Sequence, residues 1–384
     1  MSEDSFTEAT HESWIGRVGG AFKAILFGLV LFVVAFPLLF WNEGRAVKRY
    51  KTLQEGGGAV VSVTSVSVDP ANEGKLIHVT GKADTDATLT DPLFGVSANA
   101  LTLSRIVEMY QWEEKSKSKT EKKIGGGTDT VKTYTYSKTW SDKPISSSNF
   151  KKAVEHRNPG SIPYESARQI ADKVSLGAYT LSSPLVRQIH NSKSLPVGSD
   201  TPLPPSLKDK AKVLDGSFYI GTDPASPQVG DIRVKFQFVE PSEVSVIAKQ
   251  ARNTFEPYRT EAGGTIELLQ TGTYSADAMI QQAQESNTIL TWILRLLGFI
   301  VMLVGLSLVL RPLSVLADIL PILGNIVGAG TGIISFLLAA LLSLLTISIA
   351  WIVYRPMLGI LLMAVSAALI AGIMKKLNAA KKAA

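Results

Sequence analysis

Three ionisable residues stand in or beside the apolar stretches of the C-terminal third: Arg295, Arg311 and Asp318. A carboxylate at membrane depth is costly unless it is wet or paired, and such residues mark ion paths, proton relays or contacts between helices. Asp318 either faces water from an interfacial helix or pairs with Arg295 or Arg311. Arg295 either extends to the lipid headgroups or makes a buried ionic contact with another span. Any catalytic or transport function has only these three candidates.

The rest of the chain has no recognised catalytic motif. H-E-x-x-H, Walker, G-x-S-x-G and G-x-G-x-x-G patterns are absent, and the four histidines show no ligand spacing. The chain has no cysteine, which excludes disulfides, thiolate nucleophiles, cysteine–zinc sites and iron–sulfur clusters. We therefore expect no cofactor, no metal and no catalytic residue. The net charge of +6 gathers largely at predicted membrane edges, so no nucleic-acid partner is expected.

The apolar stretches predict a multi-pass α-helical membrane protein with four spans, at residues 24–41, 288–310, 331–353 and 357–374. The first span carries no charge and is roughly 27 Å long as a helix, close to the hydrocarbon thickness of a bilayer. Residues 313–326 place apolar side chains at helical spacing, which predicts an amphipathic or re-entrant interfacial segment, with a connecting helix as the alternative. Residues 1–23 form an N-terminal tail, and residues 375–384 form a basic tail.

Membrane-interface residues follow the first span. Trp41 is an interfacial aromatic, and Arg45, Lys48 and Arg49 come directly after it. The positive-inside rule applied to this span alone places these cations in the cytosol. Summed over four spans, however, the side that holds both termini carries more cations. The sequence therefore weakly favours cytosolic termini.

Residues 46–285 predict a large β-rich (α+β) domain inserted between the first and second spans. Alternating apolar and polar residues predict strands at 59–68, 75–83, 105–114, 130–140, 216–221, 231–239, 243–250 and 263–272. Helices are expected at 164–174, 183–191 and 275–287. The strands at 105–114 and 130–140 flank a charged, glycine-rich connector, which predicts a long β-hairpin with an exposed tip.

Aromatic residues repeat along both strands of this hairpin. Tyr110 and Trp112 share one face of the first strand, and Tyr134, Tyr136 and Trp140 share one face of the second. If the two faces coincide, the side chains form a ladder across the strand pair. The ladder is either part of the core or a contact surface for a partner, and aromatics on a strand face usually pack inward.

Short motifs along the whole chain carry a family resemblance. In order they are "FWNEGRAV" (40–47), "ANEGKLIHVTG" (71–81), "DPLFGV" (91–96), "VEMYQWEE" (107–114), "YTYSKTW" (134–140), "NFKKAVEHRNP" (149–159), "PQVGDIRVKF" (227–236), "VSVIAKQ" (244–250) and "WIVYRPMLGIL" (351–361). Together they make the chain resemble the LUMA family, also called transmembrane protein 43. The resemblance implies four spans, cytosolic termini and a large lumenal or periplasmic domain.

The resemblance also bears on function and location. Eukaryotic relatives are associated with the endoplasmic reticulum and inner nuclear membrane, and are thought to organise membrane complexes with lamins and emerin. The family has no established catalytic residues, so none are carried over. The absence of cysteine and the sparse hairpin tip favour a bacterial member in the cytoplasmic membrane. The terminal "KKAA" resembles a dilysine retrieval signal, which leaves an endoplasmic-reticulum or inner-nuclear-membrane location as the alternative.

Two functional hypotheses follow. The first is a non-enzymatic organiser or scaffold whose β-rich domain recruits protein or lipid partners at the bilayer surface. Its expected partners are membrane lipids, other membrane proteins and a second copy of the chain. The second is an enzyme or transporter acting on lipid or envelope substrates through Asp318, Arg295 and Arg311.

Overall fold

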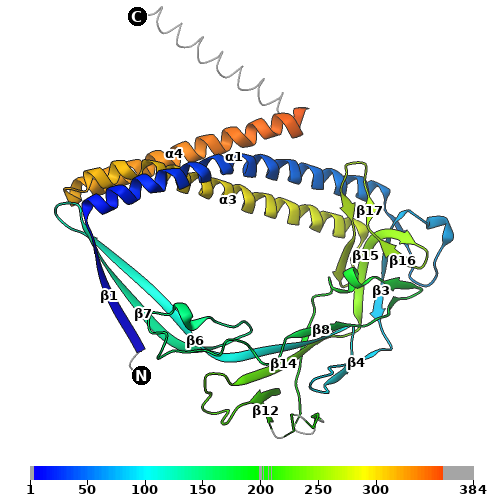
Figure 1. The fold of residues 1–384 in the computed structure, drawn as a ribbon. Helices are drawn as coiled ribbons and strands as arrows, with labels where there is room; N and C mark the ends of the chain where they lie inside the picture. The colour runs from blue at the N-terminus through cyan, green and yellow to red at the C-terminus, as the bar shows by residue number, and fades with distance from the viewer. Residues whose placement is uncertain (1–3, 199–200, 202, 206, 209, 358–384) are drawn as a thin grey trace, which may run out of the picture. The chain divides into compact units, whose positions relative to one another are not determined.

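The computed structural model describes all residues except 1–3, 199–200, 202, 206, 209 and 358–384 (Figure 1). The chain forms two compact units. We call Met1–Glu8, Gln54–Ser118 and Val131–Gln281 the β unit, and Ala9–Leu53, Lys119–Thr130 and Gln282–Ala384 the helical unit. The predicted span at 357–374 and the basic tail at 375–384 lie outside the described residues, apart from Met357.

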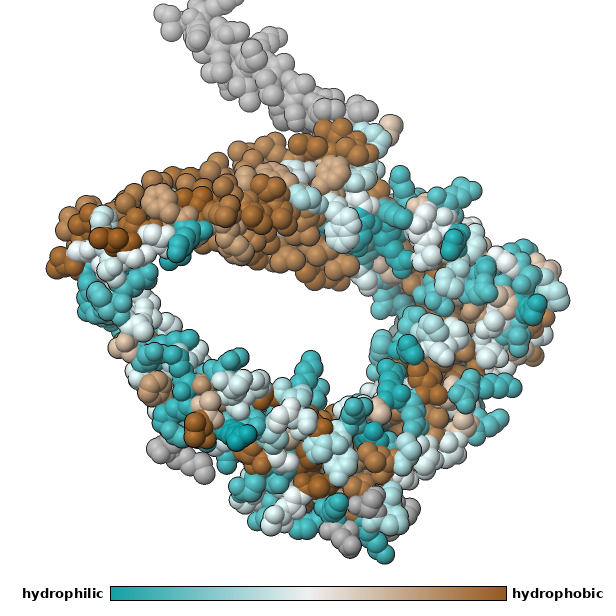
Figure 2. All heavy atoms as spheres, in the orientation of Figure 1, coloured by the Kyte–Doolittle hydropathy of each residue, from teal (hydrophilic) through white to brown (hydrophobic). Residues whose placement is uncertain are grey.

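Three long helices dominate the helical unit: α1 (Trp14–Ala59), α3 (Ala276–Ala317) and α4 (Pro321–Tyr354). Each is long and apolar enough to cross a membrane. A brown, hydrophobic surface follows them in Figure 2, because most of their leucine, isoleucine, valine and phenylalanine side chains face outward. Soluble monomers rarely expose apolar surface on this scale, so lipid is the natural solvent for these helices.

The helices differ from the predicted spans at their ends. α1 begins before residue 24 and continues past Trp41, so the supposed tail is partly helical and the cations after Trp41 lie on the same helix. Good helix formers such as Lys48 and Leu53 support this continuation. α1 ends just after three consecutive glycines, which favour its termination.

Residues 313–326 do not form one continuous helix of their own. They form the last turn of α3, a short break at 318–320 and the first turns of α4. Pro321 sits at the first position of α4, where its missing N–H costs nothing. The apolar spacing in this segment is real, but it belongs to two successive helices.

The β unit contains two large sheets. The 8-stranded sheet has the order β1-β7-β6-β14-β13-β12, with β11 paired to β14 and β8 paired to β6. Its strands are β1 (Asp4–Glu12), β6 (Thr102–Lys122), β7 (Thr128–Ser141), β8 (Ala167–Ile170), β11 (Lys193–Leu195), β12 (Ala211–Leu214), β13 (Ser217–Ile220) and β14 (Ile232–Val239). The hairpin strands β6 and β7 continue along the chain into the helical unit.

The 7-stranded sheet has the order β19-β15-β16-β10-β9-β3-β2. Its strands are β2 (Val61–Val63), β3 (Leu76–Asp84), β9 (Val174–Leu176), β10 (Tyr179–Leu181), β15 (Ser242–Ala251), β16 (Thr254–Glu256) and β19 (Leu268–Thr271). β3 also pairs antiparallel with β15, with Val79 opposite Val246, so the beginning and end of the domain meet in one sheet. Two small pairs complete the set: β4 (Thr88–Thr90) with β5 (Ser97–Asn99), and β17 (Tyr258–Arg259) with β18 (Thr265–Ile266).

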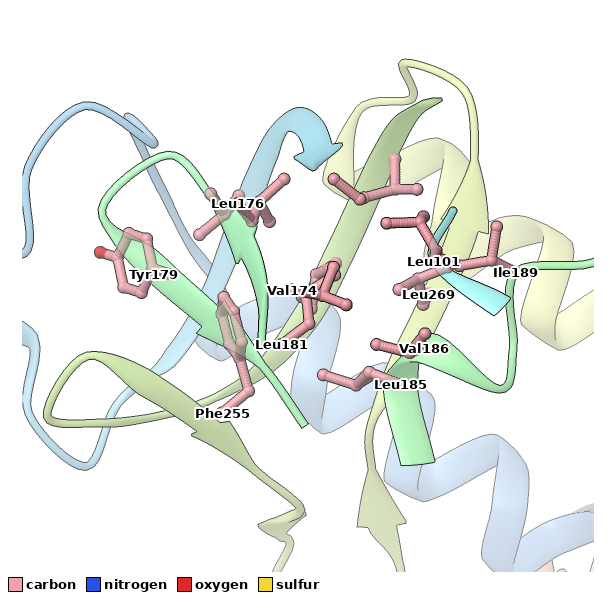
Figure 3. Packing of buried hydrophobic residues seen from close by; sticks show 14 of the residues in the cluster. Leu101, Val174, Leu176, Tyr179, Leu181, Leu185, Val186, Ile189, Phe255 and Leu269 are labelled. Carbon is pink, nitrogen blue, oxygen red and sulfur yellow. The ribbon is translucent and has the colours of Figure 1, made fainter. Parts of the chain in front are cut away.

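Two hydrophobic cores stabilise these sheets. The first packs inward-facing residues of β3, β9, β10, β15 and β16, including Leu176, Tyr179 and Phe255 (Figure 3). The second centres on Phe94, Phe218 and Phe236, whose rings lie 5.5 to 6.3 Å apart. The domain therefore has its own core and does not depend on disulfides.

The predicted strands match the structure better than the predicted short helices. Residues 164–174 contain strand β8 rather than a helix, and only α2 (Ser183–Val186) forms within 183–191. The helix expected at 275–287 is the start of α3, continuous with the following span. Pairing with β6 determines the strand at 167–170, and a window of local sequence does not contain that information.

Candidate functional site

Helices α1 and α3 of the helical unit pack closely against each other. α1 runs antiparallel to α3, since Asn42 bonds the backbone of Thr291 and Arg45 bonds Asn287. A Cβ atom added to Gly305 would lie 2.7 Å from the backbone nitrogen of Phe32 and 2.8 Å from the Gly28 carbonyl oxygen. Only glycine permits this approach, so Gly28 and Gly305 set the spacing of α1 and α3.

Asp318 is the centre of a buried ionic cluster at one end of these helices. Its carboxylate accepts hydrogen bonds from Arg17 Nη2 at 2.5 Å and Lys122 Nζ at 2.6 Å. Lys122 also donates to Asn325 Oδ1 at 2.9 Å. We call Arg17, Lys122, Asp318 and Asn325 the Asp318 cluster. The Asp318 side chain is 1% exposed, and its two cations come from α1 and from the tip of the β6–β7 hairpin.

Backbone contacts support the Asp318 cluster. Arg17 Nη1 donates to the Gly126 carbonyl at 2.5 Å, and Trp14 Nε1 donates to the Val315 carbonyl at 2.9 Å. The tip itself bonds the break between α3 and α4, from the amide of Gly125 to the carbonyl of Ile319 at 3.0 Å. The cluster thus fastens the hairpin tip, the start of α1 and the α3–α4 break to one another.

A second buried carboxylate lies toward the other end of the helices. Glu43 of α1 accepts from Arg295 Nε at 2.7 Å and from Arg295 Nη2 at 2.9 Å, a bidentate pair. Trp351 Nε1 of α4 donates to the same carboxylate at 2.8 Å. The Arg295 guanidinium also lies 4.7 Å from the ring centre of Trp292. We call Glu43, Arg295 and Trp351 the Glu43 cluster; it connects all three helices.

Neither cluster has the geometry of a reaction centre. Both carboxylates are 1% exposed and are fully used by fixed donors. Catalysis needs a group whose proton or lone pair can reach a substrate. Among the described residues, moreover, no group of three or more histidine, aspartate or glutamate side chains is arranged to hold a metal ion. Each cluster joins separate helices or strands through buried ion pairs, and we refer to both as ionic clamps in this structural sense.

The aromatic hairpin of the β unit forms a ladder. Tyr110 packs against Trp140 with ring centres 5.2 Å apart, Lys138 lies 4.8 Å over the Trp112 ring, and Glu114 accepts from Tyr136 at 2.7 Å. The predicted faces of the two strands therefore coincide.

The ladder is unevenly buried. Tyr134 and Tyr136 are buried, whereas Tyr110, Trp112 and Trp140 remain partly exposed. His156 stacks on Tyr136 at 3.8 Å and bonds Asp4 at 2.7 Å. Burial and the hydrogen bond to Glu114 raise the pKa of Tyr136 to about 12. Tyr136 is therefore a core residue, whereas Tyr110, Trp112 and Trp140 form the partly exposed part of the ladder.

Comparison with known proteins now adds to this geometry. The family model described as Transmembrane protein 43 matches residues 109–356. The chain is 36% identical to rat transmembrane protein 43 over 367 residues, which cover 93% of this chain and 90% of the rat protein. It is 35% identical to the human protein over 365 residues (92% and 90%), and 31% identical to the fruit-fly homologue over 346 residues (87% and 89%).

The chain belongs to the transmembrane protein 43 family. The sequence resemblance to this family is therefore confirmed, as is the expectation of apolar helices that can span a membrane together with a β-rich domain. No solved structure matches the chain. The region matched by the family model includes Lys122, Arg295, Asp318 and Trp351.

The structure brings some predicted membrane residues together and leaves others apart. Asp318 pairs with neither Arg295 nor Arg311, and it does not face water as an interfacial residue. Arg295 makes the buried contact to another helix rather than extending to the headgroups. Arg311 is exposed, and so are Trp41 and Lys48.

Two further interface residues have more enclosed positions. Arg45 bonds Asn287 at 2.9 Å and Thr291 at 3.0 Å, whereas Arg49 is half-buried. These residues line the helix surface beyond the first apolar stretch and do not form one site.

Sequence reasoning missed three partners. Arg17, Lys122 and Glu43 lie 301, 196 and 252 residues from the groups they bind, so no local pattern identifies the pairs. Glu43 alone carried a signal, because an acid at the end of one apolar helix matches a base near the start of another. Arg17 stood in a segment predicted to be a tail, and Lys122 stood in a hairpin tip predicted to be free.

Proposed function

We propose that this chain is a non-enzymatic organiser of membrane complexes. Its helices anchor it in lipid, and its β-rich domain recruits protein or lipid partners at the bilayer surface. Other membrane proteins and a second copy of the chain are the expected protein partners. One observation carries the proposal: both buried carboxylates of the helical unit are used to hold separate elements together.

The Asp318 cluster offers a direct test against an enzyme or transporter. The triple variant Arg17→Gln/Lys122→Gln/Asp318→Asn removes every ionisable group of the cluster without leaving a buried charge unpaired. Neutral replacement of a complete ion-pair set is often tolerated, whereas removal of one partner is not. An organiser keeps its complexes on a native gel, and cells that depend on the protein grow normally. Loss of growth with intact complexes would instead favour chemistry at Asp318.

The exposed aromatic side chains of the β6–β7 hairpin are the proposed surface for recruiting partners. Trp112 and Trp140 are partly exposed on the hairpin face, and aromatic side chains of this kind are enriched in interfaces. The Arg233 guanidinium lies 4.6 Å over Trp140, so this face also carries positive charge. Trp112→Ala/Trp140→Ala should remove a partner from the complex. The control variant Val66→Ala should not, because Val66 is 82% exposed but lies in the loop after β2, away from the hairpin in sequence.

For location we propose an integral membrane protein with the β-rich domain outside the cytosol, in a bacterial cytoplasmic membrane or, as the alternative, with a lumenal domain in the endoplasmic reticulum or inner nuclear membrane. The helical unit restricts the possible membrane topology, because the hairpin tip binds both the start of α1 and the break between α3 and α4. A strand pair this polar does not cross lipid, so the start of α1 should lie with the hairpin tip on the side of the β-rich domain, and not in the cytosol as the family resemblance implies.

A labelling experiment tests this topology. Ala9→Cys and Thr120→Cys each introduce a single thiol into a chain without cysteine. An impermeant maleimide applied to intact cells should label both variants. Labelling of only one would show that the tip does not bind the start of α1 in the membrane.

A further inference from the structure

An apolar groove runs between α1 and α4 in the helical unit. It has a volume of about 660 Å³, within the range of small-molecule sites. Its walls include Phe36, Phe40 and Trp41 of α1 and Leu345, Ile349 and Tyr354 of α4. The groove lies on helices whose long stretches of outward side chains are mainly apolar, so its surroundings are lipid.

Tyr354 and Trp41 mark one end of this groove. The Tyr354 ring packs 5.2 Å from Phe40 and lies directly over Gly44, where an added Cβ would meet the ring at 2.6 Å. Trp41 is 57% exposed. Tryptophan and tyrosine are the residues that gather at the level of lipid headgroups. This end of the groove is therefore its headgroup end.

Unpaired cations continue the groove beyond these aromatics. Lys48 follows Trp41 and Gly44 at helical spacing, so it lies on the same face of α1, one turn past Gly44. Arg355 directly follows Tyr354. Both side chains are exposed, and neither takes part in an ion pair with any residue that the structure describes. Arg45 is not available, because Asn287 and Thr291 already bind it.

We propose that this groove binds an anionic phospholipid. An acyl chain lies along Phe40, Leu345 and Ile349, and the headgroup phosphate contacts Lys48 and Arg355. Each cation near a membrane surface raises the affinity for an anionic lipid about fivefold. A zwitterionic lipid has no net charge and lacks this gain. The proposal refines lipid contact within the proposed function, but it does not depend on protein recruitment.

Native mass spectrometry of the full-length chain tests the charge requirement. The chain is released from detergent after titration with equal amounts of phosphatidylglycerol and phosphatidylcholine. Wild-type chain should retain phosphatidylglycerol preferentially, and Lys48→Gln/Arg355→Gln should lower that preference about 25-fold. The control Lys23→Gln removes an exposed lysine from the other end of α1 and should change the preference less than twofold.

A groove-filling variant tests the acyl-chain contact. Ile349→Trp should reduce retention of both lipids, whereas Leu344→Trp, at a position 63% exposed and not lining the groove, should not. Equal preference in wild type and Lys48→Gln/Arg355→Gln would overturn the proposal. Unchanged retention in Ile349→Trp would also overturn it and would point to residues beyond Met357 as the occupant. Complexes on a native gel should persist in all these variants, which separates this result from failure of the organiser role.

Discussion

Replacing Asp318 by asparagine should release the hairpin tip from the helices. The substitution keeps the size of the side chain and removes its charge. Arg17 Nη2 and Lys122 Nζ then lose their shared carboxylate. Arg17 keeps the Gly126 carbonyl, and Lys122 keeps Asn325. The Arg17 side chain is only 11% exposed, so its charge stays buried with one neutral acceptor.

The cost follows from this burial. Removing one partner of a buried ion pair costs about 3 to 5 kcal/mol, because the other charge stays unpaired. Lys122 is 29% exposed and gains water, which places the cost near the lower end, about 3 kcal/mol. This corresponds to an increase of roughly a hundredfold in the opening equilibrium of the tip.

Hydrogen exchange measured by mass spectrometry on the full-length chain reads this local opening. Amides of residues 119–130 and 9–17 should exchange about a hundredfold faster in Asp318→Asn. Asp129→Asn is the matched control, because Asp129 lies in the same tip and its partners His11 and Lys123 are exposed. It should change exchange little. Unchanged exchange in Asp318→Asn, or an equal change in the control, would refute the clamp.

Three other predictions concern the helices and the β unit. Arg295→Gln should lower the melting temperature strongly, because it leaves the buried Glu43 carboxylate with a single tryptophan donor. Adding Glu43→Gln should recover most of that loss of melting temperature. Additive losses of melting temperature in the double variant would contradict the pairing. Gly305→Ala should destabilise the chain by about 1 to 3 kcal/mol, because the added methyl group meets backbone atoms of α1. Gly330→Ala, whose methyl group meets open space, should not destabilise it. Equal losses of stability in the two variants would show that α1 and α3 do not approach closely at Gly305. Burial lowers the pKa of His78 from its ordinary value, so the unfolded chain binds more protons below about pH 6.5 and stability should fall as pH drops below that value. His78→Asn should flatten this dependence in thermal melts, and an unchanged slope would assign it to other groups.

The sequence predicted what depends on local pattern. Apolar runs identified the helices, and alternation identified the hairpin and most long strands, including β14 and β15. The ends of the helices were harder to predict, because residues 42–59 are polar yet remain helical while they pack against other elements. Propensity alone cannot distinguish that case from a loop.

The candidate site shows the same division. The sequence indicates that Asp318 and Arg295 need partners, because a charge inside an apolar stretch is costly when it is unpaired. Their true partners, Arg17, Lys122 and Glu43, are distant in sequence and come from segments with ordinary composition. Only the folded arrangement of α1, α3, α4 and the hairpin tip brings these charges together.

Photo-crosslinking at Trp112 and Trp140 tests the organiser role most directly. A benzophenone amino acid placed at either position in the full-length chain is irradiated in native membranes, with the buried position Tyr136 as control. We predict a discrete adduct, to another membrane protein or to a second copy, from the two tryptophan positions and only intramolecular products from Tyr136. Intramolecular and lipid products alone at all three positions would contradict protein recruitment through this face.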